Sequence, residues 1–194
     1  MNLDLQTERL SLQPLAASDL NLALEVFTDE EIMKYIGNVL TKGEIAEAME
    51  IETKRGGGGC IGVWCISHRT TGEKVGSVFL LPLPIEEDDT DWNLVVENQL
   101  PDCDIEIGYI LKRPAWGNGY ATEAAERLLR FAFEETPLEE IVGVIDPENE
   151  ASRRVLKKLG LLDEGLRRAY GGQCPGFRIT RQQWLDKASR NRPN

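Results

Sequence analysis

The sequence predicts one α/β domain over residues 1–194, in which strands and helices alternate along most of the chain. Its length suits a single domain with one substantial core. Its composition, 41% hydrophobic and 28% charged residues, is typical of a folded soluble protein. Apart from four consecutive glycines at 56–59, the sequence has no low-complexity tract, internal repeat or linker-like stretch. These observations favour one continuous domain.

The N-terminal region predicts a strand followed by a helix. Residues 8–13 (ERLSLQ) alternate polar and apolar side chains, as a half-buried strand does. Ser18 and Asp19 then offer side-chain caps to an amphipathic stretch that continues to Tyr35. We expect a single helix here that ends near Gly37.

A second helix and a hairpin follow. Thr41 and Glu44 have the spacing of a capping box, which predicts a helix that stops at the glycines 56–59. Residues 61–67 and 74–81 are rich in β-branched and aromatic side chains, and a turn-rich segment separates them. An antiparallel hairpin is the simplest arrangement of these two strands.

The second half of the chain continues the alternation. Residues 104–112 and 139–145 have strand patterns, and residues 119–135 between them have a strong helical pattern. Asn149 is placed to cap a short helix that Gly160 ends. Two further strands are predicted, at residues 163–169 and 176–181.

The charge of the chain excludes several kinds of partner. Lys and Arg number 22 against 33 Asp and Glu, so the net charge is −11. Such a surface repels nucleic acid and anionic membranes on average, and we expect neither as a partner. No stretch approaches the about 20 apolar residues of a membrane-spanning helix, and the N-terminus has neither signal-peptide nor transit-peptide character. A cytoplasmic location is the expectation.

The sequence predicts no metal site. The four cysteines show no CxxC spacing and are expected to be free thiols. The only histidine, His68, has no plausible ligand partners beside it. The acidic run at 86–91 (EEDDTD) is either a solvated surface or the border of a site for cationic substrates, and the sequence leaves both open.

Residues 114–124 (PAWGNGYATEA), which join a predicted strand to a predicted helix, are the segment that indicates a ligand site. At a helix start several main-chain N–H groups have no partner within the helix. Gly117 and Gly119 lack the Cβ atoms that would block a ligand, so these N–H groups can form a concave nest at the positive end of the helix dipole. A pyrophosphate fits such a nest.

The spacing excludes two common nucleotide loops. A dinucleotide-binding fingerprint reads GxGxxG or GxGxxA, but counting from Gly117 places Thr122 at the third position. A P-loop, GxxxxGK followed by Ser or Thr, occurs nowhere in the sequence. A dinucleotide-dependent oxidoreductase is therefore disfavoured.

The same segment resembles motif A of the GNAT superfamily, whose members are acetyl-CoA-dependent N-acetyltransferases. The opening TERLSLQPLAASDL is similar to the start of the branch that acetylates ribosomal-protein N-termini, which usually reads TERLxLRxLxxxD. The stretches IEIGYILKRPAWGNGYATEAAERLLRFAF and DPENEASRRVLKKLG resemble later strands and helices of that branch. Together these motifs cover most of the chain in the family's order.

The resemblance implies a GNAT-like α/β (α+β) fold, with a strongly twisted, mixed, mostly antiparallel sheet of about seven strands flanked by about four helices. Strands four and five, residues 104–112 and 139–145, would be splayed apart, with the pantetheine arm of acetyl-CoA between them. Main-chain groups of the loop would hold the pyrophosphate, and those at the end of strand four would pair with pantetheine. The cofactor-binding residues so implied are Ile110, Leu111, Lys112, Trp116, Gly117, Asn118, Gly119, Tyr120, Ala121, Thr122, Asn149 and Arg153. The nearest cations for the phosphates are Lys112, Arg113 and Arg153.

Acetyl transfer by direct attack in a ternary complex needs a base for the amine and a proton for the sulfur. Glu106 is the preferred base, and Asp104, on the same strand face, is the alternative. Ser152 is the candidate acid, with Tyr109 and Tyr120 as alternatives. These roles need side chains close to the thioester.

Four positions differ from the family's pattern or add to it. Trp116 stands where the loop usually has Gln or Arg, and Gln13 replaces the usual Arg of the opening strand. Leu156 stands where many members have the tyrosine that protonates the departing thiolate. A bulge near Ile110 would free a main-chain N–H for the thioester oxygen.

The sequence therefore predicts an N-acetyltransferase that moves an acetyl group from acetyl-CoA to a primary amine, either of a protein N-terminus or of a small molecule. The alternative is a catalytically silent acyl-CoA-binding module, which would share every cofactor residue. We expect a monomer or a homodimer.

Overall fold

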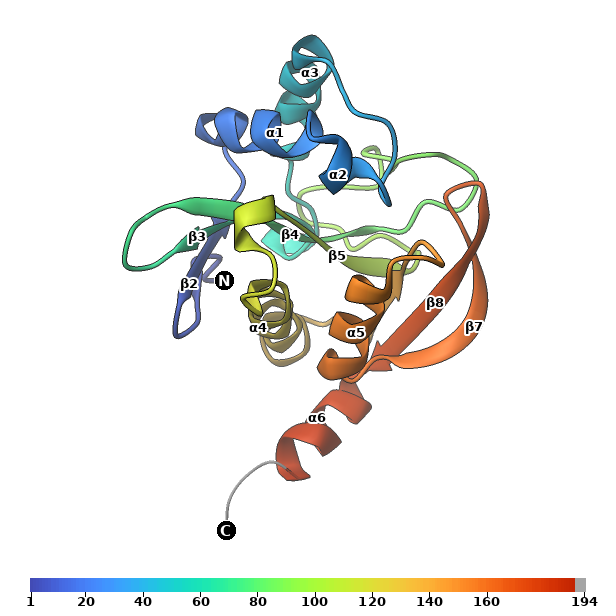
Figure 1. Cartoon of the computed structure of the whole chain (residues 1–194). Coiled ribbons are helices and arrows are strands. Elements are labelled where there is room, and N and C mark those ends of the chain that lie inside the picture. Colours follow the sequence, from blue (N-terminus) through green and yellow to red (C-terminus); the bar gives the residue numbers. More distant parts are fainter. Residues whose placement is uncertain (191–194) are drawn as a thin grey trace.

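The computed structural model describes residues 1–190, which form one twisted sheet with helices on both of its faces (Figure 1). The sheet has the strand order β1-β2-β3-β4-β5-β6-β8-β7, and only the β5–β6 pair is parallel. The strands are β1 (Leu5–Gln6), β2 (Leu10–Pro14), β3 (Gly62–His68), β4 (Lys74–Pro82), β5 (Ile105–Leu111), β6 (Glu140–Val144), β7 (Leu162–Ala169) and β8 (Gly172–Thr180). The helices are α1 (Leu20–Phe27), α2 (Glu30–Met33), α3 (Lys42–Glu52), α4 (Tyr120–Glu135), α5 (Glu150–Leu159) and α6 (Arg181–Arg190).

This architecture confirms the predicted fold class, with one strand and two helices more than expected in the described part of the chain. Helices α1, α2 and α3 lie on one side of the sheet, and α4 and α5 lie on the other (Figure 1). The hairpin β3–β4 is antiparallel, as predicted from its turn-rich connection. Strand β1, which the alternation of residues 8–13 did not include, pairs with β2 at the sheet edge.

The single helix predicted from Ser18 to Tyr35 is wrong, because the chain forms α1 and α2 there instead. The Asp29 carboxylate accepts hydrogen bonds from Glu31 N (3.0 Å) and Ile32 N (3.3 Å), and so starts a new helix within the amphipathic stretch. Asp19 does not cap α1. Its carboxylate accepts from Ala16 N (2.8 Å) and pairs with Lys74 Nζ (2.5 Å), which ties the first helix to β4.

Other predicted helix ends are confirmed. Thr41 and Glu44 form the capping box of α3. Asn149 Oδ1 accepts from Ser152 N (3.0 Å) at the start of α5, and Gly160 ends that helix with a left-handed φ of 95°. The cap by Asn149 fixes the position of the first turn of α5.

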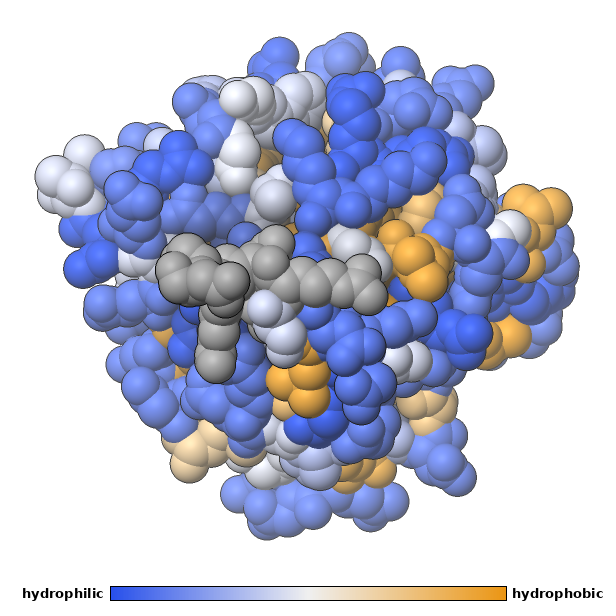
Figure 2. All heavy atoms as spheres, turned by 90° about the horizontal axis from the view of Figure 1, so that it is seen from below, coloured by the Kyte–Doolittle hydropathy of each residue, from blue (hydrophilic) through white to orange (hydrophobic). Residues whose placement is uncertain are grey.

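Helix α4 is the central element of the core. Its apolar face, including Leu128, Leu129 and Phe131, is fully buried against the sheet, and the Phe131 ring packs edge-on against Trp64 at 5.8 Å between centroids. None of the helices described in residues 1–190 is both long and apolar enough to cross a membrane. The face seen from below is mostly hydrophilic, with hydrophobic patches that stay small and separate (Figure 2).

The parallel strands β5 and β6 are splayed. Only one residue pair, Glu106 with Val142, is in register between them, whereas β5 pairs with β4 along its whole length. The sheet therefore opens beyond Glu106, between the C-terminal half of β5 and the strand beside it. The splayed strands four and five implied by the resemblance are these two.

Candidate active site

The loop between β5 and α4 presents a row of free main-chain donors. Trp116 N donates to Arg113 O (3.0 Å), and Glu123 N donates to Gly119 O (3.1 Å). Between them, the N–H groups of residues 117–122 have no hydrogen-bond acceptor within the described residues. Gly117 and Gly119 both have positive φ, 75° and 78°, so the chain turns back on itself here at little steric cost. The geometry is that of an anion-binding nest at a helix N-terminus.

Arg9 holds this loop from the other end of the chain. Its guanidinium donates to Asn118 O (3.0 Å), binds the Glu123 carboxylate at 2.6 and 2.7 Å, and lies 4.7 Å from the centre of the Tyr120 ring. Thr7 Oγ1 donates to the same carboxylate (2.5 Å). Sequence reasoning gave Thr7 and Arg9 no part in the site, although both belong to the opening TERL. That motif fixes the first turn of α4.

The side chains of the loop also stabilise its turn. Asn118 Nδ2 donates to Trp116 O (3.1 Å). The Trp116 indole N–H donates to Leu111 O (2.8 Å) at the end of β5, while much of its ring remains exposed. Trp116 therefore supports the loop, at the position where the family usually has Gln or Arg.

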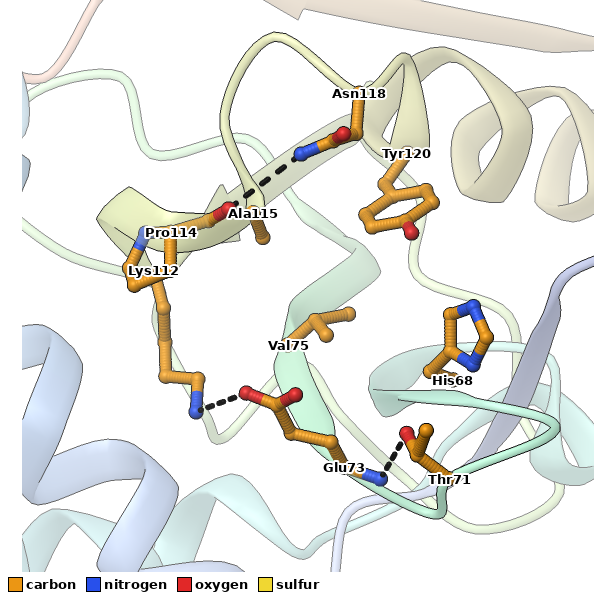
Figure 3. Close-up of a pocket in the computed structure, with 9 residues that line it drawn as sticks. All are labelled: His68, Thr71, Glu73, Val75, Lys112, Pro114, Ala115, Asn118 and Tyr120. Atoms are coloured by element: carbon orange, nitrogen blue, oxygen red, sulfur yellow. Dashed lines mark hydrogen bonds and ion pairs between the residues drawn. The ribbon is translucent and has the colours of Figure 1, made fainter.

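A pocket of about 270 Å³ opens on the β4 side of the loop, between it and the β3–β4 hairpin (Figure 3). Lys112 lies here, with Nζ 3.1 Å from Glu25 and 3.4 Å from Glu73. The Tyr120 ring packs edge-on against His68, at 6.1 Å between centroids. Both Lys112 and Tyr120 therefore lie on the side of β5 away from the splay.

The predicted phosphate-binding cations already have carboxylate partners. Arg113 Nε lies 2.7 Å from Asp29, and Arg153 lies 3.1 Å from Glu150 and 3.7 Å from Asp163. A phosphate would compete with these pairs. The main-chain donors of the loop have no such competitor.

The bulge expected near Ile110 is absent. The register between β4 and β5 runs without a shift from Ile105 to Leu111. The regular cross-strand bonds continue at both ends, where Leu83 N donates to Asp104 O and Lys112 N donates to Val75 O. Main-chain groups alternate between the two edges of a strand, so those of Tyr109 and Leu111 face β6. The splay, rather than a bulge, leaves groups on this edge of β5 without a strand partner.

Glu106 lies buried at the base of the splay, with 5% of its surface exposed. Its Oε2 accepts a hydrogen bond from the Tyr170 hydroxyl (2.6 Å), and its Oε1 accepts one from Val144 N (3.4 Å). Burial raises the pKa of Glu106 to about 7, and these two bonds act in the opposite direction. Asp104, the alternative base, instead pairs with Arg167 at the strand end.

Two of the three candidate acids, Tyr109 and Ser152, lie together, whereas Tyr120 lies beside His68 on the other side of β5. The hydroxyl of Tyr109, which is partly buried, donates to the main-chain oxygen of Ser152 (3.3 Å), so these two residues meet at the first turn of α5. Burial raises the pKa of Tyr109 to about 12. Leu156 is buried and packs over Gly143, where a Cβ would come within 3.2 Å of it. The position where many relatives have a tyrosine is thus part of the core.

Comparison with known proteins decides the family. The model of the acetyltransferase (GNAT) domain matches residues 9–162. The chain belongs to the GNAT acetyltransferase family. As a GNAT protein it is an acetyl-CoA-dependent acyltransferase that transfers an acetyl group to an amine.

Individual relatives agree with this assignment. YkkB of Bacillus subtilis (strain 168) is 32% identical over 158 residues, covering 81% of this chain and 84% of YkkB. FsC-acetyl coenzyme A-N(2)-transacetylase of Aspergillus fumigatus is 31% identical over 195 residues, covering 93% of this chain and 77% of that protein. The solved aminoglycoside acetyltransferase AAC(6')-Ib in complex with coenzyme A has a TM-score of 0.70 at 16% identity, over 92% of this chain and 99% of that one. The GNAT fold is shared along nearly the whole domain.

The structure brings together part of the predicted GNAT site. The loop N–H groups, the free edge of β5, the cap Asn149 and the buried Glu106 lie along the splay or at its ends. Tyr170, which sequence reasoning missed, contacts Glu106 across 64 residues of chain. Its only local signal is a bulky residue in the turn AYGG between two predicted strands.

Proposed function

We propose that this GNAT enzyme acetylates a primary amine by direct attack on acetyl-CoA, with Glu106 as the general base. The observation that carries the proposal is the Glu106 carboxyl, buried where β5 and β6 separate, with its pKa raised to about 7. A carboxyl with such a pKa is half ionised near neutral pH and can accept a proton from an ammonium far better than an ordinary surface glutamate.

The main chain would bind acetyl-CoA. The unpartnered N–H groups of residues 117–122 would receive its pyrophosphate, and the free edge of β5 would pair with its pantetheine arm. The side-chain amide N–H₂ of Asn149 is left for the same arm, because its oxygen is occupied as the cap of α5. The thioester would then lie near the base of the splay.

The reaction is a displacement at the thioester carbon. The ammonium of the acceptor first loses a proton to the Glu106 carboxylate, and the neutral nitrogen attacks the carbonyl carbon as a new C–N bond forms. The C–S bond then breaks, the electron pair leaves with sulfur as the thiolate of coenzyme A, and the nitrogen loses its second proton. That proton ends on the thiolate, so the products are the amide and the thiol of coenzyme A. No covalent enzyme intermediate is needed.

Tyr109 would stabilise the departing sulfur. With its pKa raised to about 12, its phenol stays protonated at neutral pH and can donate a hydrogen bond to a developing thiolate. We expect Tyr109→Phe to lower kcat by about 10-fold or more while the Kd for CoA changes little. Ser152→Ala is the matched comparison on the adjoining turn, and a larger loss in that variant would assign the role to Ser152.

The acceptor is proposed as the amine of a small molecule or of a protein N-terminus. The name of the Aspergillus relative describes transfer from acetyl coenzyme A at a nitrogen, N(2), and the opening of the chain resembles the branch that acts on ribosomal-protein N-termini. In this fold the acceptor is set by loops around a common cofactor site.

Thiol release from acetyl-CoA tests the proposed function. The panel holds polyamines, amino sugars and peptides with a free N-terminal Ala or Ser, each peptide with its N-acetylated form as a control. We expect release of CoA with at least one amine, and a product heavier by one acetyl group. Tight CoA binding without release in any reaction would instead support a silent acyl-CoA-binding module.

A further inference from the structure

The turn between β7 and β8 has an unusual backbone. Tyr170 has a φ of 49°, and among the residues that the structure describes it is the only non-glycine with a positive φ. With Gly171 at a φ of 66°, both central residues of this two-residue hairpin turn are left-handed. Such turns favour Asn-Gly or Gly-Gly, because a bulky side chain in the left-handed region is strained. A tyrosine at this position strains the turn, so the turn by itself does not explain why the residue is there.

The Tyr170 side chain reaches the proposed base. Its hydroxyl donates to Glu106 Oε2 at 2.6 Å, while Val144 N holds the other carboxylate oxygen at 3.4 Å. The two bonds come from two different elements, the first from the β7–β8 turn and the second from the end of β6. Together they fix both oxygens of a carboxylate that is almost fully buried.

The turn is also anchored so that the phenol stays in place. Tyr170 N donates to Pro84 O (3.1 Å), and Gly171 N donates to Ile85 O (3.0 Å). Next to them, Arg168 pairs with Glu86 at 2.5 Å. These contacts dock the turn on the segment after β4, which itself precedes the strand that carries Glu106. Strained conformations that persist because the surroundings hold them are frequent at functional sites.

We propose that Tyr170 is a positioning residue of the acetyl-transfer site, whose phenol is held in a strained turn in order to orient the Glu106 carboxylate at the base of the splay. This inference rests on the proposed function, because it gives Glu106 the role of base. Tyr170 acts on the reaction only through Glu106.

The hydrogen bond from Tyr170 acts to lower the pKa of Glu106. Burial raises the pKa of this carboxyl, and the bond from Tyr170 opposes the rise by stabilising the ionised form. The other titratable groups that face the pair are Tyr109 on β5, Cys174 on β8 and Asp89 near the turn. Removing the Tyr170 hydroxyl therefore leaves Glu106 harder to ionise.

Tyr170→Phe, which keeps the ring and loses the hydroxyl, tests the proposal through the pH profile. We expect the acidic limb of kcat/KM for the amine to move to higher pH, with a loss of about 10-fold near pH 6.5 and a smaller loss near pH 9. The KM for acetyl-CoA should stay within about twofold. An equal loss at every pH, or no loss, would overturn the proposal and leave Tyr170 as a structural residue.

Tyr170→Asn separates positioning from turn stability. Asparagine suits the left-handed conformation, so this variant should melt at the same temperature as the wild type or higher, and still show the shifted pH profile. A lowered melting temperature together with an unshifted pH profile would contradict the proposal, because the tyrosine would then serve the turn alone.

A direct titration keeps this test independent of the acceptor. Carboxyl ¹³C NMR of glutamate-labelled protein, with the Glu106 signal assigned by its loss in Glu106→Gln, reports the Glu106 pKa without any substrate. We expect a higher pKa in Tyr170→Phe than in the wild type. Identical titrations would refute the role of Tyr170 even if an amine is acetylated. A shifted titration with no acetylation of any amine would refute the proposed function alone.

Discussion

Replacing Glu106 by glutamine is expected to lower kcat/KM for the amine by about 10²–10⁴-fold, the usual contribution of a general base. Glutamine keeps the shape of the side chain and can still accept from Tyr170, but it cannot take a proton at neutral pH. Steady-state kinetics with the best amine of the panel measure the loss. The Kd for CoA, from isothermal titration calorimetry, should stay unchanged because Glu106 lies apart from the loop donors.

The raised pKa of Glu106 predicts how both the activity and the stability of the enzyme depend on pH. In the wild type, kcat/KM should rise as pH increases through about 7, because the base works only after it has lost its proton. The raised pKa also means that the folded state holds a proton on Glu106 where the unfolded chain has released it. Glu106 should therefore contribute stability to the wild type that is lost as pH rises from about 4.5 to about 7. Glu106→Gln should lack this contribution and keep that of Glu52, whose pKa burial also raises to about 7.

Asp104→Asn is the matched comparison, since Asp104 lies on the same face of the same segment but pairs with Arg167 outside the buried base of the splay. Its kcat/KM should stay within a few-fold of the wild type. A large loss in Asp104→Asn with a small one in Glu106→Gln would move the role of base to Asp104.

Features encoded within a few residues of each other could be predicted from the sequence. The box of Thr41 and Glu44 and the cap Asn149 work within a single turn, and the structure confirms them. Asp29 is a local signal of the same kind that was hidden inside an apolar pattern. Helix α6 was missed although Thr180 and Gln183 bond each other in the manner of a capping box.

The same distinction holds for the candidate site, whose local features could be predicted and whose long-range contacts could not. The glycine turn and its free donors could be predicted because Gly117 and Gly119 act on their own backbone. The contacts of Arg9 with Glu123 and of Tyr170 with Glu106 join residues that are far apart in the sequence. No periodicity or spacing encodes such pairs, because they depend on which strands the fold places side by side. The partners of Lys112 and Arg153 escaped prediction for the same reason.

Gly117→Asp and Gly117→Asn form a matched pair that tests the nest by charge alone. Both side chains tolerate the left-handed backbone at this position better than most, and a Cβ on Gly117 meets no atom within 4 Å. The two variants have nearly the same shape, so they should fold and melt alike. Any difference in ligand binding between them then comes from the added carboxylate.

We expect the Kd for CoA of Gly117→Asp to exceed that of Gly117→Asn by about 10- to 100-fold, as isothermal titration calorimetry would measure it. The carboxylate would repel the pyrophosphate and would also accept from the loop N–H groups that are free in the wild type. Because the repulsion is Coulombic, the ratio should shrink as salt is raised from 0.05 to 0.5 M. Equal affinities for the two variants would mean that the pyrophosphate lies elsewhere, and Arg153 at the start of α5 would become the site to examine.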